Sequence, residues 1–294
     1  MRVSGSALWN IGVLVALASA CSGNTESYTS NADTGTTHAL VSVERRDVFG
    51  TSEPAQNRAF ASFVRTPPDA DPAVVLRVVA LGSDLPEAGQ CTSPSAPREG
   101  AAPLAPSARV ELLAAGDVTL ETSAGRVELA PRAFPAVTSL FSGVVYSSRE
   151  RTSPLPPAEA YAVSASGGAL GAPLALSVEA PRVLSDVRLD GIPLDQEASL
   201  NPAGTELGWA RGNARDLVYV TVTAADGSHR VTCSFRDEGR GFLPAASVPE
   251  GSPAGLALHR LRVIPMGHHA SKGVDAGELR FDFELSTTVA VRAR

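Results

Sequence analysis

The chain has 294 residues and a formal net charge of -6 at pH 7. This acidic balance gives no reason to expect nucleic acid or an anionic lipid surface as a binding partner. A chain of this length suggests one or two domains, each with room for a hydrophobic core.

Residues 1–20 have the make-up of a cleaved signal peptide. The apolar stretch 7–20 is shorter than the roughly 20 residues that a permanent membrane helix needs. The stretch ends in a motif that resembles the lipobox of bacterial lipoproteins: Leu17, Ala18, Ser19, Ala20 and Cys21. The resemblance implies cleavage after residue 20 and a lipid, with acyl chains such as palmitate, on Cys21. Because Leu17 stands one place further out than usual, an ordinary secretion signal with a chance cysteine is the alternative.

Residues 21–37 are expected to form the lipidated cysteine and a flexible tether. Ser22 stands where an Asp would favour retention in the inner membrane, so the lipoprotein resemblance points to the outer membrane of a cell envelope. It leaves the periplasmic or surface face open. Residues 22–37 are rich in Ser, Thr, Asn and Gly and have too little apolar surface to fold. We therefore expect the membrane as a partner through the N-terminal lipid, in a protein that is anchored and does not span the bilayer.

Residues 38–180 are predicted to form the N-terminal β-sandwich. Apolar and polar residues alternate with a period of two, which marks half-buried strands, and sustained helical periodicity is missing. The alternating apolar positions are Val110 and Leu112, Val118 and Leu120, Val127 and Leu129, Tyr161, Val163 and Ala165, and Leu174, Leu176 and Val178. Residues 82–107 are dense in Pro, Ser, Gly and Ala and predict a long irregular excursion from this sandwich.

Residues 181–294 are predicted to form an immunoglobulin-like or fibronectin-like β-sandwich. Two strands, 217–223 and 228–235, flank the dipeptide Asp226-Gly227, which tolerates the positive φ of a type I′ turn. On the return strand Val231, Cys233 and Phe235 are expected to face one side. A second turn is predicted at Asp190-Gly191.

Aromatic residues support the same interpretation. Trp209 is a candidate for the core tryptophan of an immunoglobulin-like domain. Phe281, Phe283 and Leu285 alternate with charged residues and predict a late strand with one apolar face. The predicted fold class is therefore all-β, with two β-sandwich domains after the signal peptide and tether.

Cys91 and Cys233 remain once Cys21 carries a lipid. They are an even pair in an oxidising compartment, and a bond between them would close a long loop, the case in which a disulfide stabilises most. Against a bond, Cys233 is expected to point into the C-terminal core while Cys91 lies in the irregular excursion. The sequence leaves both alternatives open, a disulfide or a buried free thiol.

No motif predicts a catalytic, cofactor or metal site. None of the five histidines stands in a HExxH or HxH arrangement: His38, His229, His259, His268 and His269. Adjacent histidines at 268 and 269 would face opposite sides of a strand, so we expect a solvated loop. The turn at Asp237-Glu238 lacks the oxygen spacing of a calcium loop. A GxSxG elbow is absent from the sequence.

Three classes of function remain. The favoured hypothesis is a noncatalytic structural or protein-interaction module of the cell envelope with a protein partner of unknown identity, because sandwich loops present binding surfaces without special chemistry. The first alternative is ligand or glycan binding, which usually recruits exposed aromatic side chains. The second alternative is an enzyme whose site is assembled from scattered residues such as His259, His268 and Asp275. We expect no enzyme activity, no cofactor and no nucleic acid.

The C-terminal half also resembles, loosely, the uncharacterised two-sandwich lipoproteins of high-GC Gram-negative bacteria. The residues that carry this resemblance are Trp209, the run 231–235, the turn 237–239 and the segment 243–245. The resemblance covers a limited part of the chain. It implies a compartment and an architecture, and it brings no assigned activity, substrate or site residue.

Overall fold

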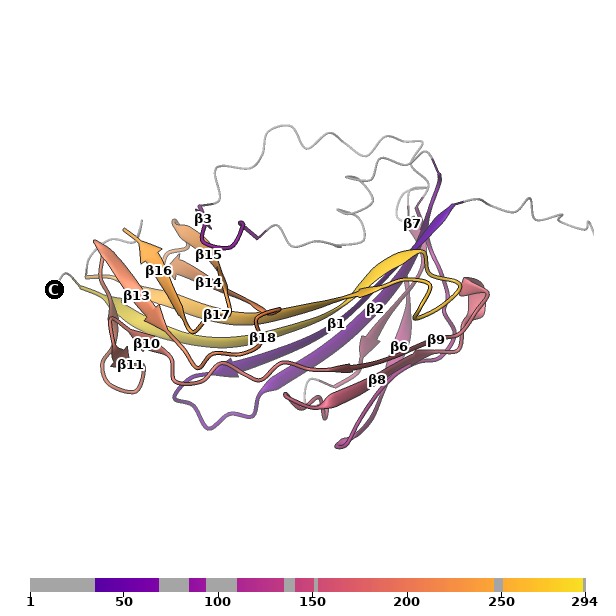
Figure 1. Ribbon diagram of the computed structural model, residues 1–294, viewed down its shortest axis with the longest axis horizontal. Helices are drawn as coiled ribbons and strands as arrows, with labels where there is room; N and C mark the ends of the chain where they lie inside the picture. Colours follow the sequence, from indigo (N-terminus) through magenta and orange to yellow (C-terminus); the bar gives the residue numbers. More distant parts are fainter. Residues whose placement is uncertain are drawn as a thin grey trace, which may run out of the picture. The chain divides into compact units, whose positions relative to one another are not determined.

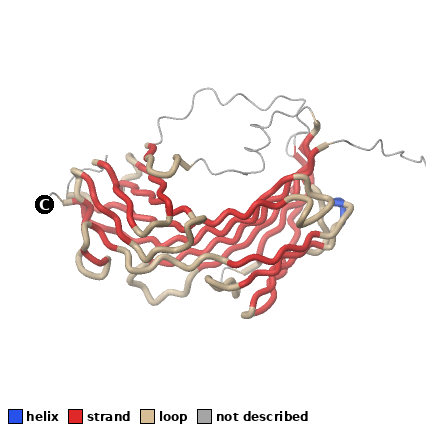
Figure 2. The backbone as a smooth tube through the Cα atoms, viewed as in Figure 1, coloured by secondary structure: helices blue, strands red, loops and turns tan. Residues whose placement is uncertain are grey.

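A computed structural model describes residues 35–68, 85–93, 110–134, 141–150, 153–245 and 251–292. Strands dominate these residues, and their one helix is a short 3-10 turn, η1 (Gly168–Leu170) (Figure 2). The expectation of an all-β fold of β-sandwich construction is confirmed. In the described ranges, no helix has the length and apolarity needed to cross a bilayer.

The N-terminal predictions fall largely outside the described residues. The signal peptide 1–20, the lipid site Cys21 and residues 22–34 of the tether are among them. The predicted end of the tether differs from the structure, because strand β1 (Thr36–Val48) already begins at Thr36. Thr37 is buried, and its N–H donates a hydrogen bond of 2.7 Å to Oδ2 of Asp275. This contact fixes the first residues of the strand, although their composition resembles that of the tether.

Most strands belong to one large sheet (Figure 1). Its order is β3-β15-β14-β17-β18-β1-β2-β4-β7-β6-β5-β8-β9, and β12 adds to β18. The bounds of the strands on the N-terminal side are β2 (Gln56–Thr66), β4 (Val110–Leu112), β5 (Val118–Thr122), β6 (Gly125–Phe134), β7 (Phe141–Ser148), β8 (Ala160–Ala165) and β9 (Leu174–Glu179). The others are β3 (Cys91–Thr92), β12 (Ser199–Leu200), β14 (Leu217–Ala224), β15 (Arg230–Arg236), β17 (Pro253–Met266) and β18 (Ala276–Val291).

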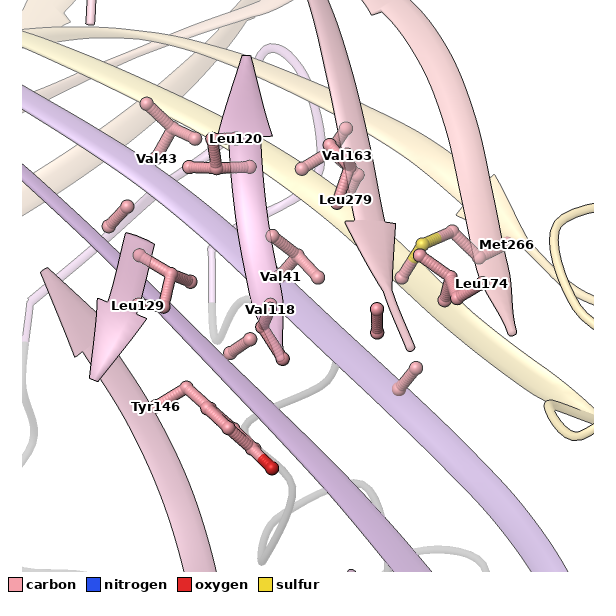
Figure 3. Packing of buried hydrophobic residues seen from close by; sticks show 14 of the residues in the cluster. Val41, Val43, Val118, Leu120, Leu129, Tyr146, Val163, Leu174, Met266 and Leu279 are labelled. Atoms are coloured by element: carbon pink, nitrogen blue, oxygen red, sulfur yellow. The ribbon is translucent and has the colours of Figure 1, made fainter. Parts of the chain in front are cut away.

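The first hydrophobic core lies inside the N-terminal part of this sheet, which folds back on itself. Residues of β1 and β18 face residues of β5 and β8 across the core, as Val41, Leu120 and Val163 do in Figure 3. Tyr161 of β8 meets Phe281 of β18 edge to face, with ring centroids 5.0 Å apart. Strand β8 shows the predicted alternation, because every second residue from Tyr161 to Ala165 is buried.

The second core lies between the C-terminal part of the large sheet and a sheet of four short strands. The small sheet has the order β11-β10-β13-β16, with β10 (Arg188–Leu189), β11 (Ile192–Pro193), β13 (Gly204–Gly208) and β16 (Arg240–Pro244). Leu189, Leu207 and Leu243 from this sheet pack in one cluster with Val220 and Leu258 of the large sheet. Two sheets that enclose such a layer form a sandwich.

The structure differs from the predicted division at residue 180 in the last two strands. Strands β17 and β18 have 14 and 16 residues, so each spans roughly 46 Å or more and reaches both cores. Phe281 and Phe283 pack in the first core, although the sequence assigned them to the second sandwich, while Val289 of the same strand packs in the second. Residues 34–294 form one compact unit.

The two predicted Asp-Gly turns differ in type. At Asp190-Gly191 both residues have positive φ, 50° and 79°, in a two-residue loop between the paired residues Leu189 and Ile192, as a type I′ turn requires. At Asp226-Gly227 the φ of Gly227 is positive at 72°, and Asp226 is not among the positive-φ residues. The type I′ prediction for that hairpin is therefore wrong. Its longer loop needs only the glycine in the left-handed region.

Cys91 and Cys233 are joined by a disulfide. The predicted excursion 82–107 contains the short strand β3, which pairs with β15 so that the two cysteines stand directly opposite each other. The expectation that Cys233 points into the C-terminal core holds, because Cys233 is fully buried there, and Cys91 packs against the same core. Cys233 can therefore lie in the core and Cys91 in the excursion while the two are bonded to each other.

Candidate functional site

One cluster of polar side chains lies on the outer face of the central strands. We define the outer face as the side of β14, β17, β18, β1 and β2 that points away from both cores. Val43, Leu258 and Phe281 point into the cores. Successive side chains of a strand alternate between faces, so their neighbours point outward. The outer face therefore carries six polar residues close together: Glu44, Arg58, Tyr219, His259, Asp282 and Glu284.

Three of these residues form a hydrogen-bonded network. The imidazole of His259 stacks on the ring of Tyr219, with centroids 4.1 Å apart and an angle of 11° between the planes. The Tyr219 hydroxyl donates a hydrogen bond of 2.6 Å to Oδ2 of Asp282, and Nδ1 of His259 lies 2.9 Å from Oδ1 of the same carboxylate. Strand pairing sets this arrangement, because Tyr219 and His259 are opposite each other in the β14–β17 ladder.

Burial and charge change the acidity of Tyr219. Burial of the phenol raises its pKa well above the usual range, and the adjacent Asp282 carboxylate raises the pKa further. The hydroxyl therefore keeps its proton at all physiological pH values and acts as a donor. Asp282 in turn has one hydrogen-bond partner on each oxygen, Tyr219 and His259, and these two contacts orient the carboxylate.

A cavity of about 380 Å³ opens beside this network. Its lining consists of Glu44, Arg45, Arg46, Gln56, Asn57, Arg58, His259, Asp282 and Glu284. Nε of Arg46 donates a 2.8 Å hydrogen bond to Oε2 of Glu284. Burial raises the pKa of Glu44, although the neighbouring Arg58 guanidinium opposes this effect. The described lining residues carry charged and hydrogen-bonding side chains, and none of them is Ser, Thr or Cys.

A second polar network lies on the inner face of β17, between the two cores. Arg260 is 1% exposed, and its guanidinium forms an ion pair with Asp237, with Nε 2.8 Å from Oδ2. The indole N–H of Trp209 donates a 2.7 Å hydrogen bond to Oδ1 of the same carboxylate. Two residues further along, Arg262 donates to both oxygens of Asp216, at 2.7 and 2.8 Å.

The inner network also holds the backbone that joins the two halves. The Arg260 guanidinium donates to the carbonyl oxygens of Arg182, Val183 and Ala210 at 3.2, 3.1 and 2.7 Å. Asp237 was expected to be part of a plain turn. It does lie in the bend between β15 and β16, but its carboxylate is fully buried, where it pairs with the Arg260 guanidinium and accepts a hydrogen bond from the Trp209 indole.

The remaining histidines are scattered. His268 and His269 are exposed, in keeping with the predicted solvated loop, and Nε2 of His268 lies 3.6 Å from Oδ1 of Asp275 at the surface. The structure thus brings together two members of the hypothetical enzyme site, and the third, His259, lies beside Asp282 instead. Among the described residues, no group of three or more His, Cys, Asp or Glu side chains could hold a metal ion.

Sequence reasoning selected His259 but missed its partners. The alternation along 280–284 placed Asp282 and Glu284 on one face, yet nothing in the sequence states that this face adjoins His259. That neighbourhood depends on the β17–β18 register, in which His259 is opposite Glu284. The polar residues at alternate positions of β1 were a further feature of the sequence that indicated a polar outer face.

The comparisons with known proteins add little. No protein-family model matches the chain, and no curated protein matches it either. Solved structures with some similarity include the FN1-FN3 domains of chicken CNTN1, at 11% identity and a TM-score of 0.24, covering 86% of this chain and 69% of that one. Another is the Fcho1 Mu homology domain of Danio rerio with bound Eps15 peptide, at 10% identity, a TM-score of 0.28 and coverages of 86% and 96%.

Proposed function

We propose that this protein is a lipid-anchored lipoprotein of the bacterial cell envelope, whose all-β unit holds a protein partner and does not turn over a substrate. The anchor would place the protein at the outer membrane. The alternatives are a ligand-binding or glycan-binding lipoprotein and an enzyme.

The observation that carries the partner-holding proposal is the continuity of the central strands. Strands β17 and β18 contribute to both hydrophobic cores, so the outer face from β14 to β2 belongs to one compact unit. A rigid face with fixed polar side chains loses little conformational entropy on binding, which favours recognition of a partner. The resemblance of residues 17–21 to a lipobox supports the anchor.

The anchor is tested by substituting the lipid site. Cys21→Ser removes the acceptor thiol, so we expect loss of labelling by a fatty-acid analogue and accumulation of an uncleaved precursor. Cys91→Ser is the control, since it removes a cysteine that carries no lipid and belongs to the disulfide with Cys233, and its labelling should persist. Labelling of the Cys21→Ser protein would overturn the anchor.

The partner is tested by photo-crosslinking in living cells. A photoreactive amino acid in place of Arg46, which has a side-chain exposure of 62% on the outer face, should give a discrete adduct. The same amino acid in place of Arg126, which is similarly exposed at 55% on β6, should not. The absence of any specific adduct at outer-face positions would contradict the proposal.

The enzyme alternative is tested by single substitutions of His259, His268 and His269 to Ala. Each variant should restore the envelope phenotype of a deletion strain, because a partner-holding surface does not depend on one titrating group. Failure of any one of them, with folding verified by circular dichroism and anchoring by fractionation, would favour the enzyme.

A further inference from the structure

Most polar groups in the outer-face cavity already have partners. Both oxygens of Asp282 contact Tyr219 or His259, and Arg46 donates to Glu284. In the described part of the chain, three lining side chains on β1 and β2 make neither a hydrogen bond nor an ion pair within 4.0 Å: Glu44, Gln56 and Arg58. These three side chains, which we call the uncommitted groups, are therefore available to bind a ligand in the cavity.

Two of the uncommitted groups carry opposite charges and stand side by side. Glu44 and Arg58 are directly opposite each other in the antiparallel β1–β2 pair, so their Cβ atoms lie about 4.5–5.5 Å apart. Gln56 is two residues from Arg58 on the same face of the strand, opposite Arg46. A carboxylate, a guanidinium and a carboxamide therefore open onto the same wall of the cavity.

The two charges differ in their contact with water. Glu44 is half-buried, and burial raises the pKa of its carboxyl group, whereas Arg58 is exposed. A cationic donor that enters the cavity would supply hydrogen bonds that the Glu44 carboxylate lacks. A carboxylate on the same molecule would match the planar fork of the Arg58 guanidinium.

We propose that this cavity binds a small zwitterion of the α-amino acid class, with its ammonium group on Glu44 and its carboxylate on Arg58. Gln56 supplies a further hydrogen bond to the ligand. The volume of about 380 Å³ falls within the range of small-molecule sites and leaves room for a ligand side chain. The proposal goes beyond partner holding and is independent of it.

The binding test uses the purified full-length chain and isothermal titration with each standard amino acid. At least one should bind saturably. The best binder is then compared with its N-acetyl derivative, which lacks the cation, and with its primary amide, which lacks the carboxylate. Each derivative should bind about tenfold more weakly or worse, because each loses one charge-assisted hydrogen bond.

Two variants assign the two ends of the ligand. Glu44→Gln keeps the shape of the side chain and removes its charge, so the free amino acid should lose its advantage over the N-acetyl derivative. Arg58→Gln should in the same way remove the advantage over the amide. If Glu44→Gln fails to fold, the exposed Arg58→Gln tests the proposal alone.

The protein supplies a matched control in Glu121 and Arg126. They are also an opposite-charge pair across antiparallel strands, but their ion pair of 3.5 Å lies on an exposed surface. Glu121→Gln and Arg126→Gln should leave titration unchanged. The proposal is overturned if no amino acid binds, if the N-acetyl derivative binds equally well, or if the cavity variants bind like the controls. Crosslinking at position 46 would be unaffected by such a failure, so the two proposals are tested separately.

Discussion

Strand β17 carries two polar networks on its opposite faces, and neighbouring residues His259 and Arg260 belong to one each. On the inner face, the side chains of Arg260 and Asp237 are 2% and 0% exposed. On the outer face, those of His259 and Asp282 are 14% and 24% exposed. A charge without water must find its partners in the protein. The inner pair finds them in backbone carbonyls and Trp209, and Nε of Arg260 and Oδ2 of Asp237, which make no hydrogen bond within the described residues, lie 2.8 Å apart in the ion pair itself. The outer pair keeps access to solvent and to ligands.

The two networks hold different parts of the protein in place. The inner network joins the linker after β9 to the loop after β13 and so connects the two sandwiches. Its energetic contribution should appear in the stability of the whole unit. The outer network lies beside a cavity, so its substitution should change binding more than folding.

The largest effect is expected from Arg260→Ala. Removal of one partner leaves Asp237 as a buried, uncompensated charge, which costs about 3–5 kcal/mol of unfolding free energy. Urea denaturation of the variant and the wild type measures the difference. Arg126→Ala removes an exposed ion-pair partner and should change stability by about 1 kcal/mol or less. Equal effects of the two substitutions would remove the distinction between the networks.

The disulfide gives the next largest effect. Cys233 is also an inward-facing residue, and its bond to Cys91 spans 142 residues of sequence. Replacing both cysteines with Ala should lower the unfolding free energy by about 2–4 kcal/mol, because the unfolded chain gains freedom. The wild type should lose a comparable amount in a reducing agent, and the double variant should be insensitive to that agent. A wild type whose unfolding midpoint ignores the reductant would contradict this prediction.

Tyr219→Phe should have a smaller effect. It removes the hydroxyl that donates to Asp282 at the rim of the outer cavity, which costs about 1 kcal/mol. Chemical denaturation of a double-mutant cycle measures the interaction. In an Asp282→Ala background the same substitution should be nearly neutral, since its acceptor is gone. Additive effects would show that the hydroxyl contributes through some other contact.

The smallest effect concerns pH. Burial raises the folded-state pKa of Glu44 above its usual value of about 4.5, so the native state holds this proton more tightly than the unfolded chain does. The contribution of Glu44 to stability therefore declines as pH rises from about 4.5 through the raised pKa, and it is least favourable above that value. The difference in unfolding free energy between wild type and Glu44→Gln, measured at pH 4 and pH 7, should shift in favour of Gln at pH 7. A difference that is constant with pH would contradict the burial argument.

Local patterns in the sequence were enough to predict strands and their buried sides. The alternation of Tyr161, Val163 and Ala165 and the burial of Trp209 follow from side-chain chemistry alone, since one face of each strand has to leave water. Turn chemistry was less reliable. Asp-Gly occurs twice, and the loop length decides which pair adopts a type I′ turn.

The site could not be predicted because it depends on which strands become neighbours. His259 meets Asp282 only through the register of β17 with β18, and Glu44 joins them only because β18 pairs with β1. The pairing of β1 with β18 is parallel and links the two ends of the compact unit. No local pattern records a partner so distant in sequence. The sequence of β18 likewise does not show that the first half of this long strand belongs to one core and the second half to the other.

The parallel β1–β18 pair also constrains the order of events when the chain is made. Eleven residues of β1 pair with β18, and Thr37 and Asp275, which meet at its start, are 238 residues apart in the chain. Contacts this remote in sequence raise the contact order and slow folding. During synthesis β1 has only β2 as a partner until the C-terminal residues have emerged, and its other edge is open to association with foreign strands. Of the described strands, β1 is therefore made first and its partner β18 last, and the open edge of β1 is exposed to aggregation until β18 has been made.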